Sequence, residues 1–200
     1  MRAVAVSQRV DTVPCRGERR DALDQSWTSL LAACDLLALP MPNHPDVAAA
    51  MFSDGPVGLL LTGGNDLARY GGDAPERDET ERRLLSIARE RGLPVMGVCR
   101  GMQVIQDVFD VPLKRIEGHV AIRHRLTGPG GGVEVNSFHG FGAAGSVPEL
   151  EVTARAPDGI VEAIRHVREP IIGQMWHPER ETPYDAADVA RIRAHFGAAR

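Results

Sequence analysis

A short apolar segment that runs directly into a helix through a cysteine flanked by glycines limits most strongly how this chain can fold. Residues 94–98 have the pattern of a buried strand, and helical spacing resumes at Met102. Gly97 and Gly101 stand two positions either side of Cys99. Only glycine at these flanks lets a strand and a helix approach without a Cβ clash. The spacing therefore predicts a strained turn that presents the cysteine side chain.

Such a turn places its central side chain at the carboxyl edge of a parallel sheet, where ligands of open α/β folds bind. The dipole at the N-terminus of the following helix favours a thiolate at that position. The alternative is that Cys99 is a buried and inert small hydrophobic residue, which is the commoner fate of a cysteine. Cys99 is thus a candidate nucleophile whose case depends on its partners.

Strand and helix patterns alternate along the first half of the chain. Residues 4–6, 36–39 and 57–61 have the composition of short buried strands. Residues 23–34 and 75–91 carry apolar side chains at helical spacing, and the charged face of the second helix is expected to be exposed to solvent. The alternation predicts an α/β fold with an open, mostly parallel sheet and helices on both faces, of the flavodoxin-like type.

The second half continues this pattern with one interruption. Residues 113–135 alternate around a glycine-rich loop and predict a local antiparallel excursion. Residues 160–166 and 171–176 predict further strands. The last helix is expected to have Thr182 as its N-cap and Pro183 in its first position. No repeat or linker divides the chain, so all 200 residues are expected to form a single domain.

Composition excludes several classes of partner. The chain has 23 Lys and Arg against 27 Asp and Glu, a formal charge of −4, so no nucleic-acid or membrane partner is expected. Its apolar runs are far shorter than the ~20 residues of a membrane span, and a cytoplasmic protein is expected. Three cysteines without C-x-x-C spacing indicate neither a disulfide framework nor a zinc site. No metal or cofactor is expected, and no role is assigned to His119, His124, His166 and His195.

A cysteine nucleophile needs a base that a third group holds in place. Residues 176–179 follow the last predicted strand. Side chains two positions apart in an extended segment project to the same side, so Glu179 is expected beside the ring of His177. The alternative is that these residues form a solvated turn. The cysteine and the histidine lie far apart in the sequence, so only the fold can bring them together.

Acyl transfer also needs N–H donors for a developing oxyanion. A neighbouring predicted strand ends in Gly63 and Gly64, and such a glycine pair allows backbone N–H groups to face a ligand. The N–H of Arg100, directly after the cysteine, is the second candidate donor. Glycine pairs are also common in ordinary turns, so this feature has weight only in combination with the others.

These elements, in this order, resemble class I glutamine amidotransferases. Residues 97–103 and 174–179 resemble more narrowly the γ-glutamyl hydrolase branch of that family. The resemblance implies a triad of Cys99, His177 and Glu179, a γ-glutamyl thioester on the cysteine, and water as the final acceptor. It implies no metal or organic cofactor in the reaction.

The same resemblance implies the contacts of the substrate. Gly64 and Arg100 supply the oxyanion amides, with Asn65 as the alternative to Gly64 because the glycine loop is shorter than in many hydrolases of this branch. The residues that hold the glutamyl group are Gln103, Asn136, Ser137, Phe138 and His139.

The N-terminal third is similar to the γ-glutamyl-CDP-amidate hydrolases of capsule phosphoramidate synthesis. The matching segments are residues 7–11, 18–27, 63–67 and 70–73. The resemblance implies cleavage of a γ-glutamyl group from a cytidine diphosphoramidate, which leaves glutamate and the CDP-amidate. Arg9, Arg19 and Arg20 either offer bidentate donors to the diphosphate or form exposed ion pairs with nearby acids.

Other functions stay open at this point. The chain could hydrolyse another γ-glutamyl amide such as γ-glutamyl-γ-aminobutyrate, or it could be a glutaminase subunit that delivers ammonia to a synthase on a separate chain. A catalytically silent binding or regulatory module on the same fold is the alternative of another class. The expected ligand is a small γ-glutamyl compound that is nucleotide-linked in the first interpretation, and a homodimer stays open.

Overall fold

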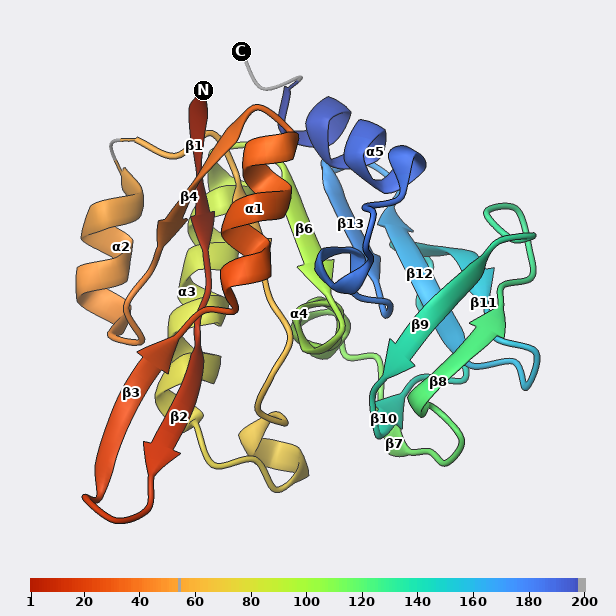
Figure 1. The fold of residues 1–200 in the computed structure, drawn as a ribbon, viewed down its shortest axis with the longest axis horizontal. Coiled ribbons are helices and arrows are strands. Elements are labelled where there is room, and N and C mark those ends of the chain that lie inside the picture. Colours follow the sequence, from red (N-terminus) through yellow and green to blue (C-terminus); the bar gives the residue numbers. More distant parts are fainter. Residues whose placement is uncertain (54, 198–200) are drawn as a thin grey trace.

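The computed structural model describes residues 1–53 and 55–197. Its main sheet contains seven strands, which in chain order are β1 (Arg2–Val6), β4 (Leu36–Pro40), β5 (Leu59–Leu61), β6 (Val95–Val98), β11 (Leu150–Arg155), β12 (Val161–His166) and β13 (Ile171–Gln174). Their order across the sheet is β11-β12-β13-β6-β5-β1-β4 (Figure 1). From β13 to β4 all neighbours pair in parallel, whereas β12 and β11 are antiparallel additions at one edge.

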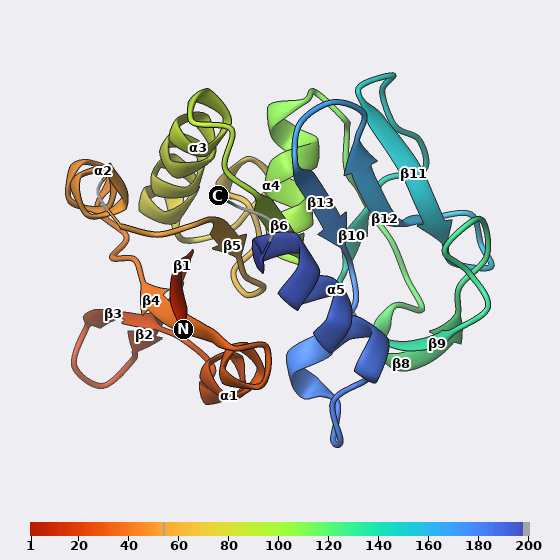
Figure 2. The ribbon, with the colours of Figure 1, turned by 90° about the horizontal axis from the view of Figure 1, so that it is seen from above.

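Helices cover both faces of this sheet (Figure 2). In the described part of the chain they are α1 (Gln25–Ala33), α2 (Pro45–Ser53), α3 (Pro75–Glu90), α4 (Arg100–Val108) and α5 (Ala186–Gly197). Successive side chains of a strand point to opposite faces of the sheet. Ala5 and Leu59 accordingly pack with α2, α3 and α4 on one face. Val6 and Leu60 pack with α1 and α5 on the other. The predicted α/β fold is confirmed. No described helix combines the length and apolar character that crossing a membrane requires.

Three short antiparallel ribbons project from the main sheet. They are β2 (Arg9–Val13) with β3 (Glu18–Ala22), β7 (Lys114–Arg115) with β10 (Phe141–Gly142), and β8 (Val120–Arg125) with β9 (Glu134–Phe138). The β8–β9 ribbon confirms the predicted antiparallel excursion. The β2–β3 ribbon has little signal in the sequence, because β3 is almost entirely charged and exposed. These two ribbons flank the carboxyl end of β6 (Figure 1).

The start of the last helix differs from the prediction. Helix α5 begins at Ala186, and Oδ1 of Asp185 accepts hydrogen bonds from the backbone N–H groups of Ala187 at 2.8 Å and Asp188 at 3.1 Å. Asp185 therefore satisfies the free N–H groups of the first turn, which is the role that the sequence pattern predicts for Thr182.

The predicted exposure of α3 is wrong for part of its charged face. Arg77, Asp78 and Glu81 are buried, because this side of the helix packs against α4 and pairs with its first residue, Arg100. Two short 3-10 helices, η1 (Ala68–Tyr70) and η2 (Pro178–Arg180), complete the described elements.

Candidate active site

Cys99 lies between β6 and α4 in a backbone conformation that residues other than glycine rarely adopt, with φ 52° and ψ −110°. A Cβ on Gly97 would lie 2.6 Å from the carbonyl carbon of Gly101, and a Cβ on Gly101 would lie 2.0 Å from the carbonyl oxygen of Leu61. Both flanking positions therefore need glycine, and the predicted strained turn is confirmed. It holds Cys99 at the carboxyl end of a central strand.

His177 and Glu179 follow β13, which is the parallel neighbour of β6. Nδ1 of His177 and Oε1 of Glu179 are 2.6 Å apart, and both side chains are buried. The carboxylate accepts a hydrogen bond from the Nδ1–H group and so fixes the orientation of the ring. Nε2 of His177 is buried and makes no hydrogen bond within the described residues, so it is the nitrogen left to exchange protons.

The cysteine and the histidine meet beside Gly63, in the loop that follows β5. A Cβ built on Gly63 would lie 2.7 Å from Cε1 of His177 and 3.6 Å from Cβ of Cys99. Burial alone lowers the pKa of His177, but negative charge on Cys99 and the carboxylate of Glu179 outweigh burial and raise it to about 9. The structure thus brings the three residues of the expected triad into one cluster and favours the protonated form of His177.

Asn136, on β9, holds the backbone of His177 from both sides. Its Oδ1 accepts a hydrogen bond from the N–H of His177 at 2.8 Å, and its Nδ2 donates to the carbonyl of His177 at 2.8 Å and to Oε1 of Glu181 at 2.7 Å. Phe138, on the same strand, packs edge-on against the ring of His177 with centroids 5.8 Å apart. The β8–β9 ribbon therefore positions the histidine.

The other residues expected to hold a glutamyl group use their polar atoms inside the protein. Nε2 of Gln103 donates to the carbonyl of Phe141 at 3.0 Å, and Oγ of Ser137 donates to the carbonyl of His119 at 2.8 Å. Nδ1 of His139 also faces the carbonyl of Phe141, at 3.0 Å. All three side chains are buried, so the structure does not turn these polar groups toward a substrate.

Arg77 is a site residue that the sequence analysis misses. Its Nη2 donates to the carbonyls of Thr62 at 2.8 Å and Gly63 at 2.9 Å, and its Nε donates to Oε1 of Glu81 at 2.9 Å. Because a trans peptide is planar, a carbonyl of Gly63 held toward Arg77 turns the N–H of Gly64 to the opposite side. Nothing in a charged helical segment distinguishes this arginine from a surface residue.

Arg100 belongs to the same buried network. Its guanidinium pairs with Asp78 and Glu81, so two arginines and two acids lie beneath the glycine loop. Burial and the nearby charge of Arg77 lower the pKa of Arg100, although Asp78 and Asp107 favour its charged form. Its backbone N–H lies in the first turn of α4, where an N–H has no acceptor within the helix. The N–H groups of Gly64 and Arg100 thus come from the loop after β5 and from the first turn of α4, both of which border Cys99.

A pocket opens beside His177, next to the β2–β3 ribbon. Two arginines line it: Arg9, whose Nε donates to Asp11 at 2.6 Å, and Arg180, whose guanidinium lies 4.4 Å from the ring centroid of Phe138. Arg180 belongs to η2, and the sequence analysis does not single it out. Further lining residues are Leu23, Asp24, Trp27, Thr62, Gly64 and Glu179.

Arg19 and Arg20 pair with acidic neighbours at the exposed surface of the β2–β3 ribbon. Nη2 of Arg19 donates to the carbonyl of Asp73 at 2.9 Å and pairs with Glu76, and Nε of Arg20 donates to Glu18 at 2.9 Å. Neither residue lines the pocket beside His177. These contacts are the exposed ion pairs that the sequence analysis weighs against phosphate binding.

Solved structures of two other proteins share this fold. The chain aligns with a putative GMP synthase subunit from Thermoplasma acidophilum at a TM-score of 0.72 and 17% identity, covering 98% of this chain and 93% of that one. It aligns with PurLQS from Thermotoga maritima at a TM-score of 0.69 and 17% identity, covering 98% of both chains. At this identity the likeness shows the fold alone.

Sequence comparison identifies the family. The chain is 30% identical over 182 residues to the gamma-glutamyl-CDP-amidate hydrolase of Campylobacter jejuni, covering 89% of this chain and 90% of the relative. It is 33% identical over 135 residues to the gamma-glutamyl-gamma-aminobutyrate hydrolase of Escherichia coli O157:H7. That match covers 52% of this chain and 53% of the relative, which is about half of each. Residues 37–190 match the family model for glutamine amidotransferase class-I, so the chain belongs to the class I glutamine amidotransferase family.

Proposed function

We propose that this protein is a cysteine-dependent hydrolase of γ-glutamyl amide bonds. The observation that carries the proposal is the buried cluster in which Glu179 holds His177 at 2.6 Å while Cys99 faces it from a strained turn. The family and the γ-glutamyl hydrolases among its relatives support the type of bond. Cys99 is the nucleophile, His177 carries the proton, and Glu179 orients the imidazole.

In the first half-reaction the Cys99 thiolate attacks the γ-carbonyl carbon of the substrate. The backbone N–H groups of Gly64 and Arg100 stabilise the negative charge that develops on the carbonyl oxygen. The imidazolium of His177 donates its Nε2 proton to the leaving nitrogen, the C–N bond breaks, and a γ-glutamyl thioester remains on the cysteine.

In the second half-reaction the neutral imidazole of His177 takes a proton from water, and the hydroxide attacks the thioester carbonyl. The C–S bond then breaks, glutamate leaves, and the thiolate of Cys99 with the imidazolium is restored. Glu179 keeps the Nδ1 proton on the ring in place throughout, so only Nε2 exchanges protons during the cycle.

The rate of hydrolysis is expected to fall at alkaline pH with an apparent pKa of about 9, the value for His177. Below this pH the imidazolium is present to protonate the leaving nitrogen, and above it the proton is lost. Because Glu179 helps to raise this pKa, Glu179→Gln should move the alkaline limb of kcat/KM to lower pH and reduce kcat by at least about 10²-fold. A profile measured from about pH 6 to 10.5 checks both effects. An unmoved alkaline limb in the variant contradicts the assignment.

We propose further that the substrate is a γ-glutamyl-CDP-amidate. The gamma-glutamyl-CDP-amidate hydrolase of Campylobacter jejuni, which is named for this substrate, aligns with this chain over 90% of its own length. The pocket beside His177 has two arginine side chains, Arg9 and Arg180, in its lining, and guanidinium groups suit the oxygens of a diphosphate. Capsule phosphoramidate synthesis is the process that this substrate implies.

Arg9→Met is expected to raise KM for γ-glutamyl-CDP-amidate by about 10-fold or more, because a charge-assisted contact to phosphate is lost. KM for γ-glutamyl-γ-aminobutyrate, which has no phosphate, should stay within about twofold. Arg20→Met removes an exposed arginine of the same ribbon that pairs with Glu18, and it serves as the matched control. Equal effects of Arg9→Met on both substrates contradict a phosphate contact.

Steady-state assays without any added protein test the activity itself. The chain alone is expected to release glutamate from γ-glutamyl amides, with the CDP-linked amide preferred. If the chain released ammonia from glutamine only when a second protein was present, the result would favour the alternative of a glutaminase subunit that delivers ammonia to a synthase. Absence of turnover with every γ-glutamyl amide would favour the silent module.

A further inference from the structure

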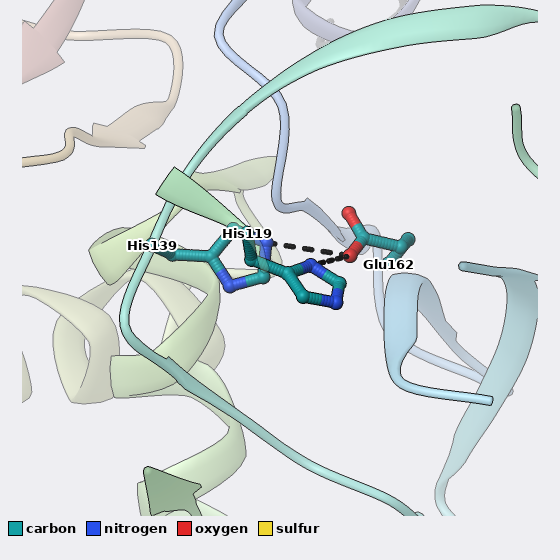
Figure 3. Close-up of side chains that lie close together, drawn as sticks. All are labelled: His119, His139 and Glu162. Atoms are coloured by element: carbon teal, nitrogen blue, oxygen red, sulfur yellow. Dashed lines mark ion pairs between the residues drawn. The ribbon is translucent and has the colours of Figure 1, made fainter. Parts of the chain in front are cut away.

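Three histidines surround one buried glutamate between the β8–β9 ribbon and β12. His119 stands directly before β8, His124 lies within it, and His139 directly follows β9, while Glu162 belongs to β12. Nδ1 of His119 and Nε2 of His139 each lie 3.3 Å from Oε1 of Glu162 (Figure 3). Nε2 of His124 lies 3.6 Å from the other carboxylate oxygen. The three donor atoms of His119, His139 and Glu162 all lie within 4.8 Å of one another.

None of the atoms that face the centre of this cluster forms a hydrogen bond within the described chain. These atoms are Nδ1 of His119, Nε2 of His124, Nε2 of His139 and both carboxylate oxygens of Glu162. The side chains of these residues are between 0% and 8% exposed, so water does not satisfy them from the surface. About nine in ten buried polar groups in proteins make a hydrogen bond. Five buried atoms without a hydrogen-bond partner at one point therefore require an explanation.

The outward nitrogens of two rings show which nitrogen carries the proton. Nε2 of His119 lies 3.1 Å from Oδ2 of Asp158, and Nδ1 of His139 lies 3.0 Å from the carbonyl oxygen of Phe141. Each oxygen accepts a hydrogen bond from the outward N–H group, so in the neutral rings the inward nitrogens carry lone pairs. Lone pairs that face the carboxylate of Glu162 repel it unless a positive charge lies between them.

Protons alone are a poor source of that charge. His119 and His139 would both have to be imidazolium ions to point an N–H at the carboxylate of Glu162, because the single proton of each neutral ring lies on its outward nitrogen. Two like charges at this range in a buried site repel. A divalent cation supplies the positive charge at a single point, and two carboxylates complement it: Glu162 faces the point directly, and Asp158 lies behind His119.

Two of the three separations between the ligand atoms also match a coordination sphere. Ligand atoms about 2.0–2.1 Å from a tetrahedral Zn²⁺ are about 3.3 Å from one another, and the two nitrogen–oxygen separations on Oε1 of Glu162 are 3.3 Å. A carboxylate or carbonyl oxygen behind each metal-binding imidazole is the usual second layer of such a site, and Asp158 and Phe141 provide it here.

We propose that His119, His139 and Glu162 bind a divalent first-row transition-metal ion, for which Zn²⁺ is the best fit, with His124 on the remaining side. The ion joins the β8–β9 ribbon to the main sheet. Asn136 on that ribbon holds the backbone of His177, so the metal stabilises the platform that carries the histidine of the site described above. The sequence has no ligand-like spacing because the four residues come from separate segments that only the fold assembles.

Zinc binding is best measured in full-length Cys99→Ala protein, because the thiolate and His177 would otherwise offer Zn²⁺ a second site. After removal of metal with a chelator and incubation with ZnSO₄, the desalted protein is expected to retain one Zn²⁺ per chain by elemental analysis. The melting temperature should rise with Zn²⁺ and fall again with EDTA. The Co²⁺ form should show the intense visible absorption of four-coordinate cobalt.

Variants of the ligands locate the site. Glu162→Gln and His139→Gln are expected to weaken Zn²⁺ binding by more than about 100-fold, and Asp158→Asn, behind a ligand, by about 10- to 100-fold. His195→Gln removes a histidine of α5 that bonds instead to the carbonyl of Val95, and it should bind Zn²⁺ as the parent does. Circular dichroism of each metal-free variant checks that it folds.

Two results overturn the proposal. One is that the Cys99→Ala parent, with no change in the cluster, retains no Zn²⁺ and shows no change in melting temperature. The other is that folded Glu162→Gln and His139→Gln proteins bind Zn²⁺ as tightly as the parent, which would place the ion elsewhere. Neither result depends on whether the protein hydrolyses γ-glutamyl amides.

Discussion

Replacement of Cys99 by alanine is expected to reduce kcat for γ-glutamyl amide hydrolysis by at least about 10⁴-fold, because no other group in the cluster can form the acyl intermediate. The fold should persist, since the substitution only shortens a buried side chain at the end of β6. Circular dichroism and thermal unfolding of the variant, beside its steady-state rate, separate loss of chemistry from loss of structure.

Cys15 provides the matched control for this substitution. It is a free, exposed cysteine in the turn between β2 and β3, so Cys15→Ala should leave kcat within about twofold of the parent. A Cys99→Ala protein with near-normal turnover would remove the proposed mechanism. Preferential alkylation of Cys99 by iodoacetamide in the parent is the expected companion result, and its absence would agree with a silent module.

Gly63→Ala is expected to lower kcat by about 10²-fold or more while leaving most of the stability in place. The added Cβ would lie 2.7 Å from Cε1 of His177, a distance at which one of the two groups must move. The peptide of Gly63 cannot retreat easily because Arg77 holds its carbonyl at 2.9 Å. The imidazole must therefore shift, and a displacement of about 1 Å is enough for a loss of this size.

Gly145→Ala is the control for the change of residue type. Gly145 is exposed, has no atom within 4 Å of an added Cβ and needs no left-handed conformation, so its substitution should leave both kcat and stability almost unchanged. Measurement of kcat and melting temperature for both variants tests the geometry. Full activity of Gly63→Ala would show that His177 does not sit against this loop during catalysis.

The parallel half of the fold is predictable because its signals are local. Apolar runs such as 57–61 and the glycines around Cys99 each specify their own strand or turn, and the order of these elements then determines the sheet. Glu179 lies beside His177 as expected, although the two are joined through the 3-10 helix η2 and not through the extended segment that the sequence pattern predicts. These features need no knowledge of which distant segments become neighbours.

The parts that the sequence analysis misses all depend on distant contacts. Arg77 has the pattern of a surface arginine until α3 packs on α4 and the loop after β5 passes over its guanidinium. The amide of Asn136 is occupied by the backbone of His177, which lies 41 positions further along the chain. The burial and the partners of such polar side chains are properties of the tertiary structure, and no periodicity indicates them.

The central claim is that Cys99 forms a covalent bond to the γ-carbonyl carbon of a γ-glutamyl group. A diazoketone analogue of glutamine tests it most directly, because it places an electrophilic carbon beside that carbonyl, where the amide nitrogen stands in the substrate. Loss of N₂ then leaves a thioether that water does not release. Peptide mass spectrometry is expected to find one adduct, on Cys99, that forms in step with the loss of hydrolysis and is suppressed by substrate. Inactivation with the adduct on Cys15 or Cys34 and an unmodified Cys99 would contradict this account.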